Sequence, residues 1–309
     1  MPLLQRYALA RPNARSSHKI PTPQGAGIAV ITATLVIVVV FAAATGTEVS
    51  TYALAATLFI AVIGAVDDIR SLPVLTRLLA QAIAVGAILS AWPGDLRIFP
   101  LGPLWVEQGV LLLAGIWFVN LVNFMDGLDW MTVAEAVPVA GGIVALGYLG
   151  HVPPAIAIVA GALGGALLGF APFNRPIAKV FLGDVGSLPV GLLLGWCLLE
   201  LAYRGQFTAA LLLPLYYLSD ATITMLRRLL TGEKVWAAHR SHFYQRATDN
   251  GFSVLNVVGI VFALNLALVA LAIASTLAIS PAAKIIALLA GAALVGLALF
   301  RFARTRPTR

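Results

Sequence analysis

Residues 26–45 read AGIAVITATLVIVVVFAAAT, a run of 20 positions without a charged side chain. The hydrocarbon core of a bilayer is about 30 Å thick, and a helix of about 20 apolar residues crosses it. A run of this length and composition therefore predicts a helix that spans a membrane. Similar runs recur along the whole chain, so this stretch indicates the class of the entire protein.

The composition excludes a soluble domain. Of the 309 residues, 60% are hydrophobic and only 11% are charged, whereas soluble domains average about 25% charged residues. The net charge of +7 would suggest a nucleic-acid partner in a soluble protein. Here it fits loops that face anionic lipid headgroups and phosphorylated substrates, and we expect no nucleic acid. A single cysteine, Cys197, excludes an intramolecular disulfide and a cysteine metal cluster.

Apolar stretches of suitable length nearly exhaust the chain. We therefore predict an all-α, polytopic integral membrane protein with about ten transmembrane helices, built as one integral domain over residues 1–309 without a soluble appendage. The expected spans are 26–45, 50–66, 74–92, 104–122, 131–149, 153–172, 186–203, 207–226, 254–279 and 281–300.

The distribution of cations predicts the orientation, because loops on the cytoplasmic side of a membrane carry an excess of Lys and Arg. If residues 1–25 are cytoplasmic and the number of spans is even, both termini face the cytoplasm. The cytoplasmic segments and the adjoining helix ends then hold every Lys and Arg except Arg97, Arg204 and Lys284. The opposite orientation would place nearly every cation outside.

Acidic residues gather on this same predicted cytoplasmic side. They are Asp67, Asp68, Asp126, Asp129 and Asp184. A carboxylate at a bilayer edge is costly, and a single one at a helix end often only contacts headgroups. Five in three short motifs on one face indicate a common site instead. The adjacent pair requires a nearby cation, and Mg²⁺ is held by one or two carboxylates together with substrate phosphate oxygens.

The second and third acidic motifs allow alternative local structures. If a helix continues beyond residue 123, then Asn123, Asp126 and Asp129 lie three positions apart and share one face. If Gly127 breaks that helix, the same groups lie on a tight turn. Glycines flank Asp184 just before a predicted helix, which would place its carboxylate near a positive helix end. A plain helix N-cap is an alternative explanation for Asp184 or Ser187 when either is taken alone.

The longest polar loop contains His239 and His242, with arginines at Arg240 and Arg246. A lone histidine is usually structural. Two histidines flanked by arginines, on the same membrane side as the aspartates, indicate a group that binds pyrophosphate. As a zinc site the pair is incomplete.

Taken together, these motifs resemble those of the polyprenyl-phosphate N-acetylhexosamine-1-phosphate transferases, glycosyltransferase family 4. The resemblance extends from Arg11 to about Ser253. The loop Arg15-Ser16-Ser17-His18 and the form His239-Arg240-Ser241-His242 are similar to the branch that initiates O-antigen synthesis. Members of this family normally have a transmembrane helix before that first loop, whereas this chain has only ten residues before Arg11.

The resemblance implies roles residue by residue. Asp67 and Asp68 match the aspartate pair, Asp126 and Asp129 match acids on the nucleotide side beside Asn123, and Asp184 matches a magnesium ligand, with the aspartate pair as its partner ligands. His239 and His242 match the histidine loop, where Arg240 and Arg246 would contact substrate. Lys19 matches a lysine that helps to hold the uridine. Arg77 is the expected basic residue after the aspartate pair.

The implied activity is a Mg²⁺-dependent phosphotransferase reaction. A sugar 1-phosphate moves from a UDP-N-acetylhexosamine to a polyprenyl phosphate such as undecaprenyl phosphate, giving a polyprenyl-diphospho-sugar and UMP. The implied location is the bacterial inner membrane with the active site on the cytoplasmic face, and a homodimer is a possible assembly. The alternative is a secondary transporter, which would carry acids near mid-bilayer. Among the predicted spans, Asp220 is the acid that fits that alternative, although a structural contact explains it better.

Overall fold

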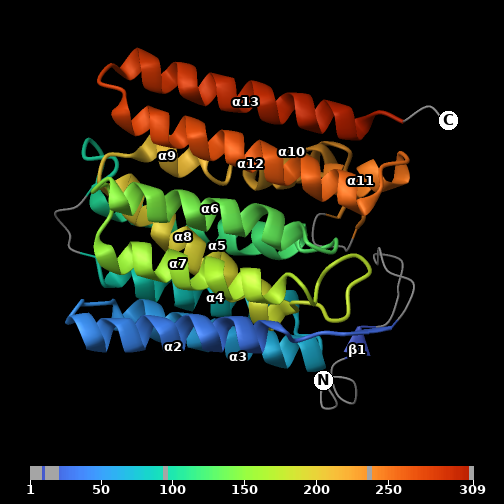
Figure 1. Cartoon of the computed structure of the whole chain (residues 1–309), viewed down its shortest axis with the longest axis horizontal. Helices are drawn as coiled ribbons and strands as arrows, with labels where there is room; N and C mark the ends of the chain where they lie inside the picture. Colours follow the sequence, from blue (N-terminus) through green and yellow to red (C-terminus); the bar gives the residue numbers. More distant parts are fainter. Residues whose placement is uncertain (1–8, 11–20, 93–96, 235–238, 306–309) are drawn as a thin grey trace.

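A computed structural model of the chain describes residues 9–10, 21–92, 97–234 and 239–305. Within these residues the fold is a bundle of long helices that run back and forth nearly parallel to one another (Figure 1). The helices that cross the bundle unbroken are α2 (Gly27–Thr45), α3 (Thr51–Ile69), α4 (Val74–Ser90), α5 (Leu104–Met125), α6 (Met131–Tyr148), α7 (Pro154–Phe170), α8 (Asp184–Tyr203), α12 (Val254–Leu277) and α13 (Pro281–Ala303).

One further pass is broken in its middle. It consists of α9 (Phe207–Leu212) and α10 (Leu215–Leu230), which are separated at Pro214. Proline lacks the N–H that a continuous helix needs and clashes with the preceding turn, so the break lies where the sequence requires it. At one end of the bundle lies the short helix α11 (Phe243–Asp249).

Minor β structure accompanies the helices in the part of the chain that the structure describes. Strands β1 (Leu9–Ala10) and β2 (Thr22–Pro23) pair in antiparallel fashion, with Leu9 opposite Pro23. The backbone then continues alongside the loop before α8, where the Phe181 N–H donates to the Pro23 carbonyl at 2.8 Å. These contacts fasten the segment before α2 to the end of the bundle at which α8 begins.

Length and composition mark seven of the described helices as able to cross a membrane: α2, α3, α5, α6, α8, α12 and α13. The prediction of an all-helical polytopic membrane protein is therefore confirmed. Helices α4 and α7 are apolar but have only 17 residues each, and the α9–α10 pass is interrupted. The figure of about ten spans accordingly stays a prediction.

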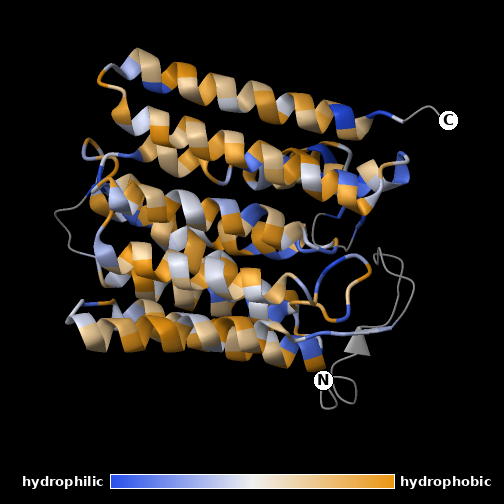
Figure 2. Cartoon of the chain, in the orientation of Figure 1, coloured by the Kyte–Doolittle hydropathy of each residue, from blue (hydrophilic) through white to orange (hydrophobic). Residues whose placement is uncertain are grey.

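The packing places α8 at the centre, where it contacts α3 and α5 most extensively. In its membrane-spanning stretch 83% of the residues are buried, whereas in those of α2 and α13, which lie at the outside, 28% of the residues are buried. Most residues of the peripheral helices are hydrophobic (Figure 2), and large apolar side chains such as Val40 in α2 and Leu297 in α13 are exposed. This arrangement suits a lipid environment, because apolar side chains on the outer helices meet acyl chains at no cost.

Glycines allow the helices around the start of α8 to approach with their backbones nearly touching. A Cβ atom added at Gly27 would lie 2.3 Å from the backbone of Gly186, and one added at Gly64 would lie 2.3 Å from the Asp184 carbonyl oxygen. No side chain fits at either distance. Because these positions are glycine, the backbone of α8 can approach the start of α2 and the end of α3 this closely.

We predict that Gly27→Ala lowers the melting temperature of the purified protein in detergent. The new methyl group would collide with backbone atoms, and overpacking of this kind typically costs about 1–3 kcal/mol. Gly259→Ala in α12 is the matched control, because a Cβ there meets nothing within 4 Å and alanine favours a helix more than glycine does. Equal melting temperatures for the two variants would contradict this account of the contact.

Candidate active site

The first acidic pair meets the beginning of α8. Asp68 Oδ1 accepts a hydrogen bond from the Asp184 N–H at 2.9 Å, and its Oδ2 accepts one from the Val185 N–H at 3.0 Å. The first N–H groups of a helix have no partner within the helix and carry the positive end of its dipole. The carboxylate of Asp68 therefore caps α8 from another helix, across a sequence separation of 116 residues.

The residue before α8 must be glycine for this cap to form. Gly183 has φ of +76°, and a Cβ atom there would lie 2.5 Å from Asp68 Oδ2. Asp184 lies at the positive helix end, as the sequence predicts, but the cap comes from Asp68. The alternative of a plain N-cap at Asp184 is wrong, because Asp184 is the first helical residue and Gly183 occupies the cap position.

Asp67 points to a different set of partners. Its Oδ1 accepts from the Leu72 N–H at 2.5 Å, and its Oδ2 accepts from Arg77 at 3.1 Å. The same guanidinium nitrogen of Arg77 lies 4.0 Å from Asp184 Oδ2. Arg77, the basic residue expected after the aspartate pair, thus stands between the first and third acidic motifs.

Asn123 brings the second motif to the third. Its Nδ2 donates to Asp184 Oδ1 and to Ser187 Oγ, both at 2.8 Å. Helix α5 ends at Met125, so Asp126 and Asp129 lie beyond it. The prediction of one helical face for all three residues is therefore wrong, and its alternative, a turn at Gly127, is what the structure shows.

Beyond that turn, the two aspartates face different partners. Thr132 donates a hydrogen bond to Asp126, whereas Asp129 Oδ2 accepts from the Ala178 N–H at 3.0 Å. Burial raises the pKa of Asp126 to about 7, against the lowering effect of the Thr132 hydroxyl, and the negative charges of Asp68 and Asp129 raise it further. These charge effects show that the first and second motifs lie close enough to interact.

The histidine loop packs against this second motif. The Tyr244 hydroxyl, from α11, donates to the Phe124 carbonyl at 3.0 Å. A Cβ atom at Gly127 would lie 2.1 Å from the same hydroxyl oxygen, so only glycine fits under the tyrosine. The rings of His239 and His242 lie 4.8 Å apart. The structure therefore brings the two histidines together beside the second acidic motif, as expected.

The arginines of this loop are engaged within the protein. Arg240 lies 3.2 Å from the Asp249 carboxylate and donates to Thr248 Oγ1 at 3.1 Å. The Arg246 guanidinium lies over the Phe243 ring at 5.6 Å from its centre. Their contact with substrate stays a prediction.

An unperturbed imidazole, with a pKa of about 6.5, is partly protonated at neutral pH. Burial lowers the pKa of His239 to about 4, and nearby cations such as Arg228 lower it further. An imidazole with this pKa is neutral at pH 7. The sequence could not show this, because it does not reveal how far the ring is removed from water.

Two sets of residues complete the account of the predicted site. Lys19 lies outside the described residues. The described end of the first loop does reach the site, because the Gln24 side chain donates to the Asp68 carbonyl at 3.0 Å. Asp129 bonds to Ala178 in the loop between α7 and α8. The Asn174 side chain of the same loop accepts a hydrogen bond from the Trp130 N–H at 2.7 Å and so fixes the loop against the α5–α6 turn.

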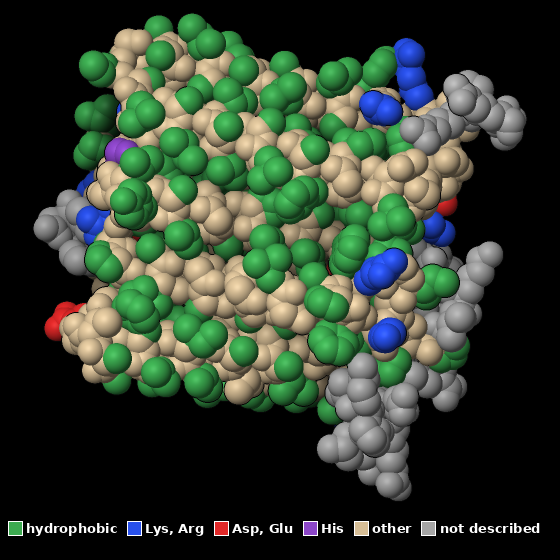
Figure 3. Space-filling view, in the orientation of Figure 1, with side chains coloured by type: hydrophobic (Ala, Val, Ile, Leu, Met, Phe, Trp, Pro, Cys, Tyr) green, Lys and Arg blue, Asp and Glu red, His purple; other side chains and the backbone are tan. Residues whose placement is uncertain are grey.

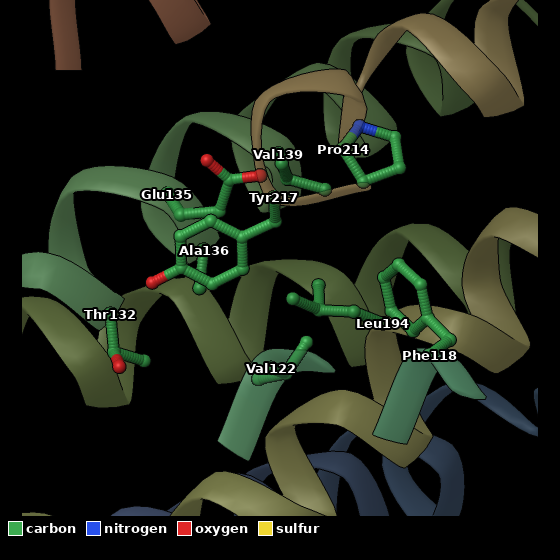
Figure 4. A pocket seen from close by; sticks show the side chains of 9 residues that line it. All are labelled: Phe118, Val122, Thr132, Glu135, Ala136, Val139, Leu194, Pro214 and Tyr217. Carbon is green, nitrogen blue, oxygen red and sulfur yellow. The ribbon is translucent and has the colours of Figure 1, made fainter. Parts of the chain in front are cut away.

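Glu135 is a buried acid that sequence reasoning missed. It lines a small buried pocket with Thr132 and Tyr217, in which the Tyr217 hydroxyl is directed toward Thr132 (Figure 4). The Asn265 side chain donates to Glu135 at 2.6 Å from α12. The available signal was an acid four residues into an otherwise apolar predicted span.

Comparison with known proteins agrees with this geometry. The model of glycosyl transferase family 4 matches residues 50–202, which include the three acidic motifs. A decaprenyl-phosphate N-acetylglucosaminephosphotransferase of Mycobacterium leprae is 30% identical over 89% of this chain and 78% of its own length. A probable undecaprenyl-phosphate N-acetylglucosaminyl 1-phosphate transferase of Bacillus subtilis is 24% identical over 85% of this chain and 79% of its own length.

A shorter match is to a phospho-N-acetylmuramoyl-pentapeptide-transferase of Streptococcus thermophilus, 34% identical over 43% of this chain and 40% of that protein. The assignment to the O-antigen branch stays a prediction. The extended match to the mycobacterial relative and the family match over the acidic motifs nevertheless agree. The chain belongs to glycosyl transferase family 4, the superfamily of polyprenyl-phosphate N-acetylhexosamine-1-phosphate transferases.

Proposed function

We propose that the protein transfers a sugar 1-phosphate from a UDP-N-acetylhexosamine to undecaprenyl phosphate or a related polyprenyl phosphate, and so initiates a cell-surface polysaccharide such as O-antigen. The observation that carries the proposal is the meeting of three acidic motifs, from α3, the α5–α6 turn and the start of α8, at one end of an apolar bundle. The relatives' names describe polyprenyl-phosphate sugar phosphotransferases.

In the proposed reaction, an oxygen of the lipid phosphate attacks the β-phosphorus of the nucleotide sugar. A new P–O bond forms to the lipid phosphate, and the bond from the β-phosphorus to the bridging oxygen breaks. UMP leaves with the electron pair of that bond. Both reactants are anions, so the site must offset their mutual repulsion.

The residues that would hold Mg²⁺ are Asp67, Asp68 and Asp184. No set of three or more His, Cys, Asp or Glu side chains forms a ready-made metal site in the described ranges. However, one guanidinium nitrogen of Arg77 lies 3.1 Å from Asp67 Oδ2 and 4.0 Å from Asp184 Oδ2, so the two carboxyl groups lie around a single cation. An all-oxygen donor set is the kind that Mg²⁺ prefers. When bound, the ion would neutralise charge on the phosphates and on the leaving UMP.

The protein's own side chains would orient the reactants. Asn123 holds Asp184 by a hydrogen bond at 2.8 Å, and Arg77 provides a positive charge 3.1 Å from Asp67. Asp126 and Asp129 would contact the nucleotide side. The Asp67 or Asp68 carboxylate could accept a proton from the lipid phosphate, a modest role because a phosphate with a second pKa near 6 is mostly ionised at pH 7.

The cation distribution supports a cytoplasmic site. Among the described residues, every Lys and Arg lies at the end where α8 begins, except Arg97, Arg204 and Lys284. On the face drawn in Figure 3, apolar side chains cover the flank and most of the blue Lys and Arg side chains lie toward that end. Loops rich in these residues are retained in the cytoplasm.

We expect Asp184→Asn to abolish UMP release from a UDP-N-acetylhexosamine by membranes supplied with undecaprenyl phosphate and Mg²⁺. The amide keeps the shape of the carboxylate but removes its charge, and loss of such electrostatic stabilisation typically costs about a hundredfold or more in rate. The control is Glu48→Gln, the same change at an exposed position at the opposite end of the bundle. Near-normal turnover of Asp184→Asn at saturating Mg²⁺ would refute its role, and UMP release that needed no lipid phosphate would refute the proposed reaction.

Asp126→Asn should raise the melting temperature more at pH 8.5 than at pH 4, in buffer without Mg²⁺. The raised pKa of about 7 means that folding favours the protonated carboxyl. Its contribution to stability is complete below the unfolded pKa near 3.9 and is lost as the pH rises through about 7. Asparagine resembles the neutral form at every pH. A difference between variant and wild type that does not grow with pH would show that Asp126 does not titrate in this range.

A fusion of alkaline phosphatase to the C-terminus should be inactive in a bacterial host, because that enzyme folds only outside the cytoplasm. A fusion placed in the 46–50 loop, at the opposite end of α2, should be active. The reverse pattern would contradict the proposed orientation of the site.

A further inference from the structure

Asp220 lies in α10 and is completely buried. Its carboxylate collects hydrogen-bond donors from its own helix and from the histidine loop. They are the Tyr216 hydroxyl at 3.1 Å, the Thr224 hydroxyl at 3.4 Å, the Phe243 N–H at 2.9 Å and the Tyr244 N–H at 3.1 Å. Two of these are backbone N–H groups, which can only donate. The surroundings therefore suit an ionised carboxylate that accepts on both oxygens.

His242 faces this carboxylate. Its side chain is buried, and its Nδ1 lies 3.3 Å from Asp220 Oδ1. The contact does not have hydrogen-bond geometry, and no hydrogen-bond partner reaches Nδ1 within the described part of the chain. A bare nitrogen lone pair would be repelled by a carboxylate oxygen at this distance, so Nδ1 carries a proton.

His239 is held in the opposite way. Its Nδ1 accepts a hydrogen bond from the Ser241 N–H at 3.4 Å and lies 2.9 Å from the Ser241 hydroxyl. Because a backbone N–H cannot accept, Nδ1 of His239 must be without a proton. Burial keeps this ring neutral by lowering its pKa to about 4. The proton of the neutral ring is then on Nε2.

We propose that Asp220 is a positioning residue that fixes His242 in the Nδ1–H form, while Ser241 fixes His239 in the Nε2–H form. The two rings lie 4.8 Å apart, and their Nε2 atoms remain for contact with substrate. This refines the proposed function, on which its catalytic part rests: one buried carboxylate orients the histidine loop.

The position of Asp220 explains how one buried anion can set the loop. The two N–H groups that it accepts belong to the first residues of α11, Phe243 and Tyr244. Tyr244 in turn reaches the Phe124 carbonyl beside the second acidic motif. The carboxylate thus fixes the start of α11, the orientation of His242 and, through Tyr244, the contact with the α5–α6 turn.

The tautomers can be read directly by ¹⁵N NMR of histidine-labelled protein in lipid nanodiscs. The chain has only 4 histidines, and His239→Gln and His242→Gln assign the two signals. We expect wild-type His242 to show a protonated Nδ1 and wild-type His239 a protonated Nε2. Either ring in the other form would overturn the proposal, whatever the outcome of the UMP-release assay.

The variant Asp220→Asn tests whether Asp220 is what fixes the tautomer of His242. Its amide oxygen can still accept from the Tyr244 N–H, but an NH2 group in the place of Oδ1 would present a donor to both the Phe243 N–H and His242 Nδ1. We therefore expect His242 to change to the Nε2–H form and UMP release to fall about tenfold or more, as for other residues that orient a functional group. Thr224→Val is the matched control: it removes one donor to the same carboxylate and should leave the tautomer and the rate nearly unchanged. An unchanged His242 tautomer in Asp220→Asn, or a changed tautomer with wild-type turnover, would overturn the positioning role.

Discussion

The site depends first on the hydrogen bonds between the Asp68 carboxylate and the two N–H groups at the start of α8. Inside an apolar bundle, helix ends must be satisfied by the protein, because lipid supplies no partner. Asp68 satisfies α8 and thereby joins α3 to it, while Gly64 and Gly183 leave room for the carboxylate and the backbone. Once this contact is made, Asp184 can lie beside only a few groups. Asp67, Arg77 and Asn123 are those groups.

A second buried anion has a similar effect on the other side of the site. Asp220 satisfies the start of α11 as Asp68 satisfies the start of α8, and each carboxylate comes from a different helix. In both cases one acid fastens a helix N-terminus and also fixes a neighbouring side chain. The protein thus uses helix ends, which a membrane bundle must satisfy in any event, to place polar groups accurately. The cost of burying each charge is offset by the donors that surround it.

Charge is concentrated in a way that serves two purposes. Lys and Arg at the end that contains the site fit retention of that end in the cytoplasm, where anionic nucleotide sugars are found, and they also favour the binding of phosphates. The aspartates counter this field locally, and the metal site that we propose would lie among them. The neutral state of His239 fits the same balance, since arginines already surround the loop.

Much of the fold was predictable from the sequence because the length and polarity of a membrane helix are local properties. The expected spans 26–45 and 104–122, for example, correspond to α2 and α5 with ends that differ by at most three residues. The aspartates were recognisable as site residues because a carboxylate at a helix end is costly wherever the helix packs. Glu135 carried the same signal and was overlooked within its span.

Only the tertiary structure decided which polar groups of the site contact one another. The expectation that Asp68 holds metal stays a prediction, whereas the structure shows that it caps α8, a contact between residues 116 positions apart. Asn123, Asp126 and Asp129 could share a helical face or a turn, and the end of α5 at Met125 shows that Asp126 and Asp129 lie beyond the helix. The charge of His239 depended on burial by distant elements. By itself the sequence determined the apolar helices, the polar end of the bundle and the acids that lie there, because these follow from the local cost of placing each residue in lipid. The partners, tautomers and protonation states came from contacts between distant segments, whose energies no single segment contains.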